Sequence, residues 1–390
     1  MKRLSALVAT VVLALCFGAG QAAAMEGGSG AGQDAGQSAG SGQSASGGSG
    51  AYQLGPSNSA GSIRVLSPGD NGSVSQSNNT TAGAVAANLN KTDQSVDQSQ
   101  TGGGGYGSDS THIAGQEAKN AQHADADATA KQLGAKNDAL SIRVLSPGDA
   151  GDVTQSNNAI ALGIAANGNK TSQSTTQSQS GSGYGSDYAQ IAGQEAGNYQ
   201  KADADATAVQ VKPTNTATSI RVLSPGDDGD VTQSNNATAL AAALNLNDTE
   251  QTIDQQQTGS GHGSDYLQIA GQGAWSGQHA DADAKAIQLG AKNEYTPVRV
   301  GSPNGKDKKH GKDEHGKDAK KAPHGGSVEQ SNSVGAFGLA LNLNKTYQPL
   351  EQSQTGHGSS GLQVGGQGVW SGQDASADVF GLQGVMRSKK

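Results

Sequence analysis

The stretch QSNNATALAAALNLNDTEQTIDQQQ, residues 233–257, decides the fold class. Every second position carries Gln, Asn, Ala or Thr, with Ile253 as the one exception. A period of two places successive side chains on opposite faces of an extended strand, whereas an α-helix would repeat every 3.6 residues. Residues 74–100 and 328–354 keep the same alternation. The sequence therefore predicts an all-β fold built from long strands.

The second half of the repeating unit alternates in the same way. Residues 116–132 carry Gln, Ala or Asn at every second position, and Asp125 and Asp127 fall on the opposite parity. We expect the amide and alanine face to be buried and the aspartates to point toward water.

A buried face of Gln and Asn costs free energy unless its amides are hydrogen-bonded. Stacking identical residues about 4.8 Å apart satisfies them, because each amide bonds to the amides above and below it. Small alanines also let facing sheets approach closely. The predicted ladder residues are Gln76, Asn78, Gln94, Gln98, Gln155, Asn157, Gln173, Gln177, Gln233, Asn235, Gln251, Gln255, Gln330, Asn332, Gln348 and Gln352.

The chain consists of repeats. SIRVLSPGD begins at Ser62, Ser141 and Ser219, and the degenerate PVRVGSPNG begins at Pro297, so the unit recurs at nearly equal intervals. Such self-similarity is typical of solenoids, in which each unit packs mainly against its neighbours. The predicted repeats are 62–140, 141–218, 219–296 and 297–384, the last with a charged insert at 305–324.

Two expectations concern the path of the chain within a repeat. A strand of 27 residues would span roughly 90 Å, far more than the usual five or six residues. We expect a bend at ANLNKT, residues 87–92, because Asn tolerates turn geometries. Gln also recurs within a repeat, from Gln76 to Gln98 and from Gln94 to Gln116. This spacing suggests a β-solenoid, β-helix-like, with short coils of that length and three or four coils in each unit.

The N-terminus carries the marks of an export signal at residues 1–24. Lys2 and Arg3 precede an apolar run, and three alanines end at Ala24 as a cleavage site. The one cysteine, Cys16, lies inside this signal, so the processed chain would have no thiol or disulfide. No other apolar run approaches the roughly 20 residues that span a bilayer. We expect a secreted protein, extracellular or held at the cell surface, with no membrane span after signal removal.

The flanks of the repeats are simpler. Residues 25–61 are rich in Gly, Ser and Gln, which predicts a flexible leader or a degenerate half-unit. Residues 385–390 form a basic tail.

Composition excludes several classes of protein. Of 390 residues 59 are Gly, aromatics are 3%, and most of the 33% hydrophobic residues are alanine, so a large apolar core of the enzyme type is hard to build. The net charge of −8 does not favour nucleic acid. A disordered low-complexity chain is the alternative, but disorder does not require an unbroken parity in four repeats.

The alternation of Gln, Asn and Ala in exported, Gly-rich repeats resembles the curlin repeats of bacterial curli. The resemblance covers residues 62–384 in style and not in exact motif: here Gln76 is followed by Asn78 and Asn79, the glycines that curlin units place between their glutamines are missing, and the unit is much longer. It implies stacked strand-turn-strand coils, an amyloid architecture and a role as a surface fibre in biofilm.

Four other motifs carry possible chemistry. GGYGSDSTH, residues 104–112, matches a calcium-binding β-roll turn, although a plain turn accounts for it. The ADADA runs could bind calcium or cleave polysaccharide, but a charged outer row that discourages sheet pairing is favoured. Trp275 and Trp370 could stack on sugars or pack as cap residues. The insert histidines, His310, His315 and His324, are expected in a solvated loop.

The sequence therefore predicts an exported, non-enzymatic structural protein, with no cofactor, no metal and no catalytic residue, that self-associates into a fibre or coat of the biofilm-scaffold type. Other surface matrix proteins or glycans are further expected partners. The alternative is a monomeric β-solenoid adhesin that binds calcium or glycans. A β-helical polysaccharide enzyme and a largely disordered secreted protein are minor alternatives.

Overall fold

The computed structural model describes residues 33–102, 110–181, 188–260, 265–301, 326–357 and 360–384, which form 14 β-strands and no helix. The strands make three parallel sheets. Sheet A contains β1 (Gln33–Leu54), β4 (Ser110–Leu133), β7 (Tyr188–Val211), β10 (Asp265–Leu289) and β14 (Ser360–Gly384). Sheet B contains β2 (Ser57–Val65), β5 (Lys136–Val144), β8 (Thr214–Val222) and β11 (Lys292–Val300). Sheet C contains β3 (Val74–Gly102), β6 (Val153–Gly181), β9 (Val231–Ser260) and β12 (Val328–Tyr347), with β13 (Leu350–His357) also beside β9.

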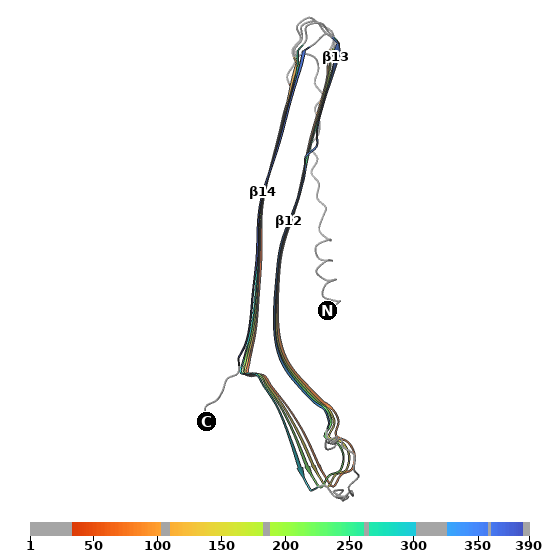
Figure 1. Ribbon diagram of the computed structural model, residues 1–390, viewed down its shortest axis with the longest axis vertical. Coiled ribbons are helices and arrows are strands. Elements are labelled where there is room, and N and C mark those ends of the chain that lie inside the picture. The colour runs from red at the N-terminus through yellow and green to blue at the C-terminus, as the bar shows by residue number, and fades with distance from the viewer. Residues whose placement is uncertain are drawn as a thin grey trace, which may run out of the picture.

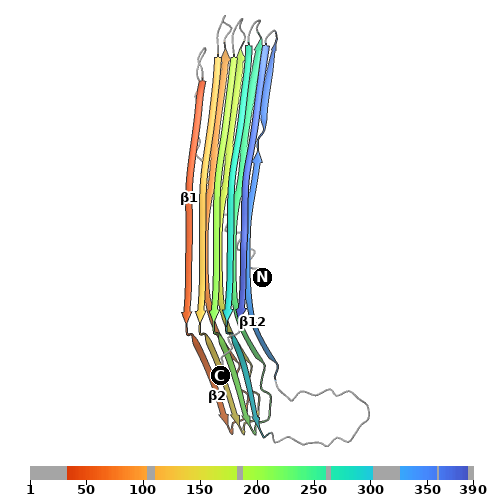
Figure 2. The same cartoon turned by 60° about the vertical axis from the view of Figure 1, so that its left-hand side comes forward.

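The chain is a β-solenoid in which one coil is one whole repeat. It runs along a long strand of sheet C, returns along a long strand of sheet A and continues into a short strand of sheet B (Figure 1). Figure 2 shows the strands of each sheet side by side in chain order. Gln76 pairs with Gln155, and Gln155 with Gln233, without a shift in register. The predicted all-β solenoid is confirmed.

The expected short coil, with a length equal to the spacing from Gln76 to Gln98, is wrong. Both glutamines lie on the same strand, β3, and they pair with Gln155 and Gln177 of the next repeat. The recurrence of Gln within a repeat is therefore a feature of one inner face along a strand and not of successive coils. Long strands inside the sheet, such as β6, persist because in-register neighbours satisfy their backbone groups on both sides, and β3 pairs with β6 along its whole length.

The expected corner at residues 87–92 is also wrong, since β3 continues through it. Asn88 and Asn90 point inward and donate to Asn167 and Asn169 of the next coil, each at 3.0 Å. Their side chains are thus satisfied in the extended conformation, and a turn would break these bonds.

The N-terminal segment is a half-unit and not a flexible leader over its described part. β1 pairs with β4 along its whole length, and β2 pairs with β5. Gln37 and Gln43 lie opposite Gln116 and Gln122, so the glycine-rich strand keeps the amide pattern of the full repeats. This segment is a strand despite its Gly and Ser content, because β4 provides hydrogen-bond partners along its whole length.

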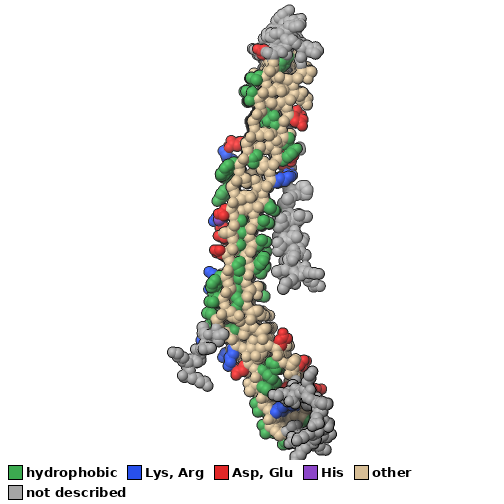
Figure 3. All heavy atoms as spheres, viewed as in Figure 1, with side chains coloured by type: hydrophobic (Ala, Val, Ile, Leu, Met, Phe, Trp, Pro, Cys, Tyr) green, Lys and Arg blue, Asp and Glu red, His purple; other side chains and the backbone are tan. Residues whose placement is uncertain are grey.

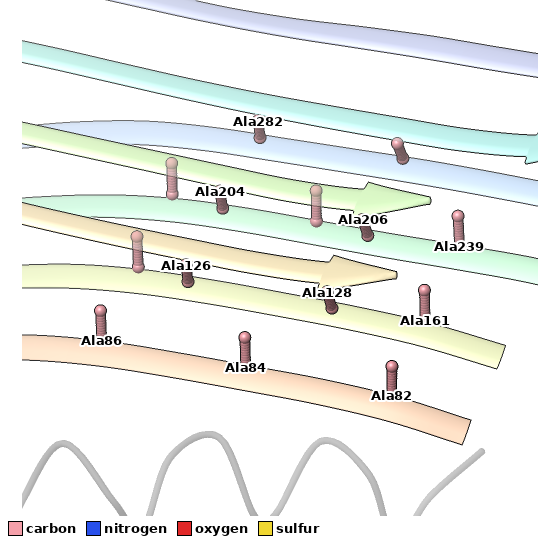
Figure 4. Packing of buried hydrophobic residues seen from close by; sticks show 14 of the residues in the cluster. Ala82, Ala84, Ala86, Ala126, Ala128, Ala161, Ala204, Ala206, Ala239 and Ala282 are labelled. Carbon is pink, nitrogen blue, oxygen red and sulfur yellow. The ribbon is translucent and has the colours of Figure 1, made fainter. Parts of the chain in front are cut away.

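The core between sheets A and C is made of alanine. Ala84 and Ala86 of β3 face Ala126 of β4, and the same pattern repeats in the later coils (Figure 4). The sheets approach so closely that a Cβ added at Gly163 would lie 2.5 Å from the carbonyl oxygen of Asp205. Even alanine at position 163 would therefore force the facing strands to shift at this level.

Two corners of each coil use left-handed backbone. Gly134 and Gly290, with φ of 65° and 62°, end the long strands of sheet A, and Lys212 holds the equivalent place with φ of 52°. Leu145 and Leu223 begin the turn after the short strand with φ of 52° and 51°. Glycine adopts this geometry without strain, whereas Lys and Leu do so at a cost that the surrounding stack must offset.

Candidate functional site

The inner amides form continuous ladders through the coils. Gln155 Nε2 donates to Gln76 Oε1 at 2.8 Å, Gln233 donates to Gln155 at 2.8 Å, and Gln330 donates to Gln233 at 2.7 Å. The row through Asn78 is equally regular, with distances of 2.9 Å at each step.

The structure brings the predicted ladder residues together in four rows. Two further rows join Gln94 to Gln173, Gln251 and Gln348, and Gln98 to Gln177, Gln255 and Gln352. In the middle coils these amides are fully buried, as at Gln155 and Gln177. At the last coil Gln330 and Asn332 are exposed, because the stack ends there.

Ladder amides also bond across the core. Gln155 Nε2 donates to the Thr216 carbonyl at 3.1 Å, and Gln200 Nε2 to the Leu246 carbonyl at 2.9 Å. One amide hydrogen thus bonds along the stack and the other across the core to the backbone of the facing layer. The bonds across the core therefore join the facing sheets, to whose stability the burial of small alanine side chains adds little.

Further rows start on the N-terminal half-coil, and of these the sequence pattern predicted only the inward parity of residues 116–132. Three glutamine rows run the length of sheet A, and one asparagine row runs through sheet B. They comprise Gln37, Gln116, Gln194, Gln272 and Gln367; Gln43, Gln122, Gln200, Gln278 and Gln373; Gln53, Gln132, Gln210, Gln288 and Gln383; and Asn58, Asn137, Asn215 and Asn293.

Sequence reasoning missed a column of stacked arginines beside the SPGD turns. Arg143 and Arg221 are buried, and Arg143 donates to the Asp149 and Pro147 carbonyls at 2.7 and 2.9 Å. Burial and the neighbouring Arg221 and Arg64 lower the pKa of Arg143. Asp228 accepts from Arg221 and Arg299 at 2.8 and 2.9 Å. The guanidinium groups hold the turn carbonyls together, and the recurring Arg in SIRV was the available signal.

The ladders have a direction. In each glutamine row described above, the amide nitrogen of the later coil donates to the amide oxygen of the earlier coil, as from Gln155 to Gln76. The asparagine rows run the opposite way, as from Asn78 to Asn157. The last coil therefore carries the terminal amide oxygens of the glutamine rows, and the first coil carries their terminal amide nitrogens. The two ends of the stack are chemically complementary.

The predicted aspartate rows lie on the outer face of sheet A. Asp127, Asp205, Asp283 and Asp378 occupy one row, with their backbones in register. Partial burial, together with the charges of Asp127 and Asp283, raises the pKa of Asp205 to about 6. The Asp205 carboxylate therefore gains a proton as the pH falls through about 6. Among the described residues, no group of three or more His, Cys, Asp or Glu side chains could hold a metal ion.

Aromatic pairs stack between successive coils. Trp275 and Trp370 lie on the outer face of sheet A with ring centroids 5.7 Å apart and planes 4° apart. Tyr188 and Tyr266 stack at 5.3 Å on the inner side and are buried. The tryptophans thus pack as a ladder of their own, and both rings stay partly exposed.

His112 interrupts an otherwise uniform glutamine row. Its strand neighbours in the row are Gln33 and Gln190, and its Nε2 lies 2.8 Å from Gln100 Oε1. The side chain is fully buried and Nδ1 has no hydrogen-bond partner. Burial lowers the pKa of His112. Among the described residues, His112 Nδ1 is the one buried side-chain nitrogen or oxygen without a hydrogen-bond partner.

Several sequence predictions lie outside the described residues. These are the export signal with Cys16, the basic tail, most of the calcium-type turn at 104–112, and the insert histidines, His310, His315 and His324. The part of the chain that the structure describes has no helix that could cross a membrane. Comparison of the chain with protein-family models, curated proteins and solved structures gave no match.

Proposed function

We propose that this chain is an exported, non-enzymatic structural protein that assembles end to end into a cell-surface or extracellular fibre or coat. The observation that carries the proposal is the match between the two edges of sheet A. Rows of glutamine begin on β1 at Gln37 and Gln43 and end on β14 at Gln367 and Gln373, in one continuous register. A second copy placed beyond β14 continues these rows with its own β1.

The chemistry of the two edges favours head-to-tail pairing. β14 carries the terminal amide oxygens of the glutamine rows and β1 the terminal amide nitrogens, so the next copy donates where the first accepts. Parallel edge strands also offer unpaired backbone groups to a new strand. Assembly thus repeats, between chains, the contacts that hold successive coils together.

Proline distinguishes the edges of the three sheets at the C-terminal end. Pro297 lies in β11, at the edge of sheet B, and Pro349 separates β12 from β13, at the edge of sheet C. Proline cannot donate a backbone hydrogen bond and blunts an edge strand. Neither β1 nor β14 contains proline. These differences support sheet A as the growing junction of the proposed fibre.

The test uses charges buried only in the assembly. Ala45 of β1 and Ala375 of β14 occupy the same inward row at opposite ends of the stack, since they pair with Ala124 and Ala280. Ala375 is exposed and Ala45 is partly buried beside the alanine cluster at the open edge of the stack, so lysine at either position can extend past that edge to water in the single chain but would be buried in a fibre. The matched controls are Ser46→Lys and Ser376→Lys, one residue further on the outward face.

Ala45→Lys and Ala375→Lys should each abolish fibres in electron micrographs, while both controls still form them. By sedimentation, each variant alone forms no species larger than the doubly substituted Ala45→Lys/Ala375→Lys chain forms, and an equimolar mixture gives larger species, because one free end of each kind remains. Larger species formed by either variant alone would contradict head-to-tail pairing. Fibres that persist in both variants would refute assembly through the edges of sheet A.

The alternative, a monomeric surface adhesin, draws on the partly exposed Trp275 and Trp370 pair. Aromatic rings of this kind can stack on sugars. A processed chain that remains monomeric at all concentrations and binds glycans, with binding lost in Trp370→Ala, would favour that function over the fibre.

A further inference from the structure

The outer face of sheet C carries an apolar patch that the proposed end-to-end assembly leaves open. It consists of the outward residues between 160 and 164 on β6, 240 and 246 on β9, and 337 and 343 on β12, with Val85 and Leu89 on β3. Phe337 is 56% exposed and Leu343 is 51% exposed. Figure 3 shows hydrophobic side chains on the outer flanks of the stack as well as along its middle.

The patch has no charged residue and sharp polar borders. On one side lies the asparagine row of Asn158 and Asn236, joined by a 2.9 Å hydrogen bond. On the other side lie Lys345 and Asp248, which form an ion pair at 3.5 Å. The outer face of sheet A, in contrast, carries the rows of aspartate. Removing water from the outer face of sheet C therefore costs less free energy than removing it from the charged outer face of sheet A.

The size of the patch suits a weak to moderate protein interface. The patch has four register rows of outward positions, about 6.8 Å apart along the strands, and four strands about 4.8 Å apart, which together cover roughly 500 Å². Two such faces bury roughly 1,000 Å² in total, which is near the lower limit for a specific interface. The number of contacts along a fibre multiplies with the number of copies, so that a modest contact suffices.

Two of the four rows of the patch are complementary to themselves in side-chain size. Across one row the side chains grow from Gly83 on β3 to Phe337 on β12, and across another from Ala87 to Leu341. A second copy turned by 180° about an axis along the strands sets β12 against β3. Large side chains then oppose small ones in both rows, as in an isologous interface.

We propose that the outer face of sheet C is a lateral interface that packs against the same face of a second copy of this chain. The pairing uses a surface different from the strand edges, and it joins two stacks side by side. It does not depend on the end-to-end contact. The outward side chains lie in rows with the spacing of a β-sheet, so they fit against another such sheet. The rows in which large side chains would oppose small ones favour a second copy of this chain as the partner.

The test is made in the Ala45→Lys/Ala375→Lys chain, in which the edges of sheet A are blocked. We expect this chain to form a dimer whose dissociation is measured by analytical ultracentrifugation. Phe337→Lys and Leu341→Lys should each weaken the dimer at least about tenfold, because the lysine is desolvated in the interface. Leu362→Lys is the matched control, since Leu362 is 58% exposed on the outer face of sheet A.

Circular dichroism checks that each variant keeps its strands, which is expected because these side chains are solvent-exposed in the single chain. In the unblocked chain, Phe337→Lys should leave single fibres that no longer pair laterally. A blocked chain that stays monomeric overturns the lateral interface while leaving end-to-end assembly intact. Equal dimer affinity in Phe337→Lys and Leu362→Lys overturns it as well. Binding of the monomer to neutral lipid vesicles, lost in Phe337→Lys, would assign the patch to a membrane and also overturn the proposal.

Discussion

Removing one fully buried ladder amide should destabilise the stack far more than removing the equivalent amide at its end. Gln155→Ala deletes the donor to Gln76 at 2.8 Å and the acceptor of Gln233 at 2.8 Å. It also deletes the bond across the core to the Thr216 carbonyl at 3.1 Å. Leaving a buried donor or acceptor unsatisfied costs about 1–3 kcal/mol for each group. We expect a loss of about 3–5 kcal/mol in the free energy of unfolding.

Gln330→Ala is the matched control, because Gln330 occupies the same row at the open end. It donates one ladder bond, to Gln233 at 2.7 Å, and its side chain is exposed. Water can replace that bond, so we expect a loss below about 1 kcal/mol.

The measurement is guanidinium denaturation followed by circular dichroism, in an Ala45→Lys/Ala375→Lys/Phe337→Lys chain so that neither end-to-end nor lateral assembly contributes. Ser156→Ala, on the outward face next to Gln155, controls for the local change in β6. Equal losses in Gln155→Ala and Gln330→Ala would refute the reasoning, because they would show that burial in the ladder contributes nothing.

Three further substitutions follow from the same structure. His112→Gln completes a glutamine row and should stabilise the fold, and its denaturation midpoint should rise more at pH 5 than at pH 7.5. The reason is that burial lowers the pKa of the His112 imidazole, so the parent chain loses stability as the pH falls below about 6.5. A gain at pH 7.5 that equals or exceeds the gain at pH 5 would contradict this. For Asp205, whose pKa is raised to about 6 in the fold, stability is present below about pH 4 and lost as the pH rises through 6. Asp205→Asn should therefore be more stable than the parent at pH 8 with little difference at pH 4, and a difference that grows toward acid would refute it. Lys212→Gly should raise the stability by up to about 1 kcal/mol, because relief of a left-handed φ of 52° outweighs the added flexibility of glycine in the unfolded chain. Thermal unfolding checks the sign, with Lys201→Gly in the β7 interior as a control that should destabilise, and a loss of stability in Lys212→Gly would contradict this.

The fold class followed from the sequence because parity is a local property. A period of two over residues 233–257 permits only an extended chain, and Gln and Asn at equivalent places of each repeat permit a satisfied core only when they stack. The positions of the ladder residues could therefore be predicted from Gln76 to Gln352 without knowledge of the coil.

The length of the coil could not be predicted, because it depends on which strand lies beside which. The spacing from Gln76 to Gln98 is compatible with two coils or with one long strand, and usual strand lengths favoured the wrong choice. The rule that Asn marks turns failed at Asn88 because a ladder partner was present. Likewise, composition left open a flexible leader or a degenerate half-unit before Ser62, and the pairing of β1 with β4 selects the half-unit.

The arginine column escaped prediction for a similar reason. Arg143 reaches the turn carbonyls of its own coil and of the coil before it, including Gly69. Such a contact joins residues far apart in the sequence and has no periodic signal within one strand. Only the recurrence of Arg in each SIRV segment marked it.

The central claim is that one coil equals one repeat, with equivalent residues of successive repeats side by side. Disulfide trapping in a Cys16→Ser chain tests it directly, using Thr154, Thr176 and Thr232. Thr154 and Thr232 are register partners in β6 and β9, whereas Thr154 and Thr176 both lie on β6, at the spacing that short coils would bring together. Mild oxidation should close an intrachain disulfide in the Thr154→Cys/Thr232→Cys chain and none in the Thr154→Cys/Thr176→Cys chain, read by intact mass. A disulfide in the second chain and none in the first would contradict the account.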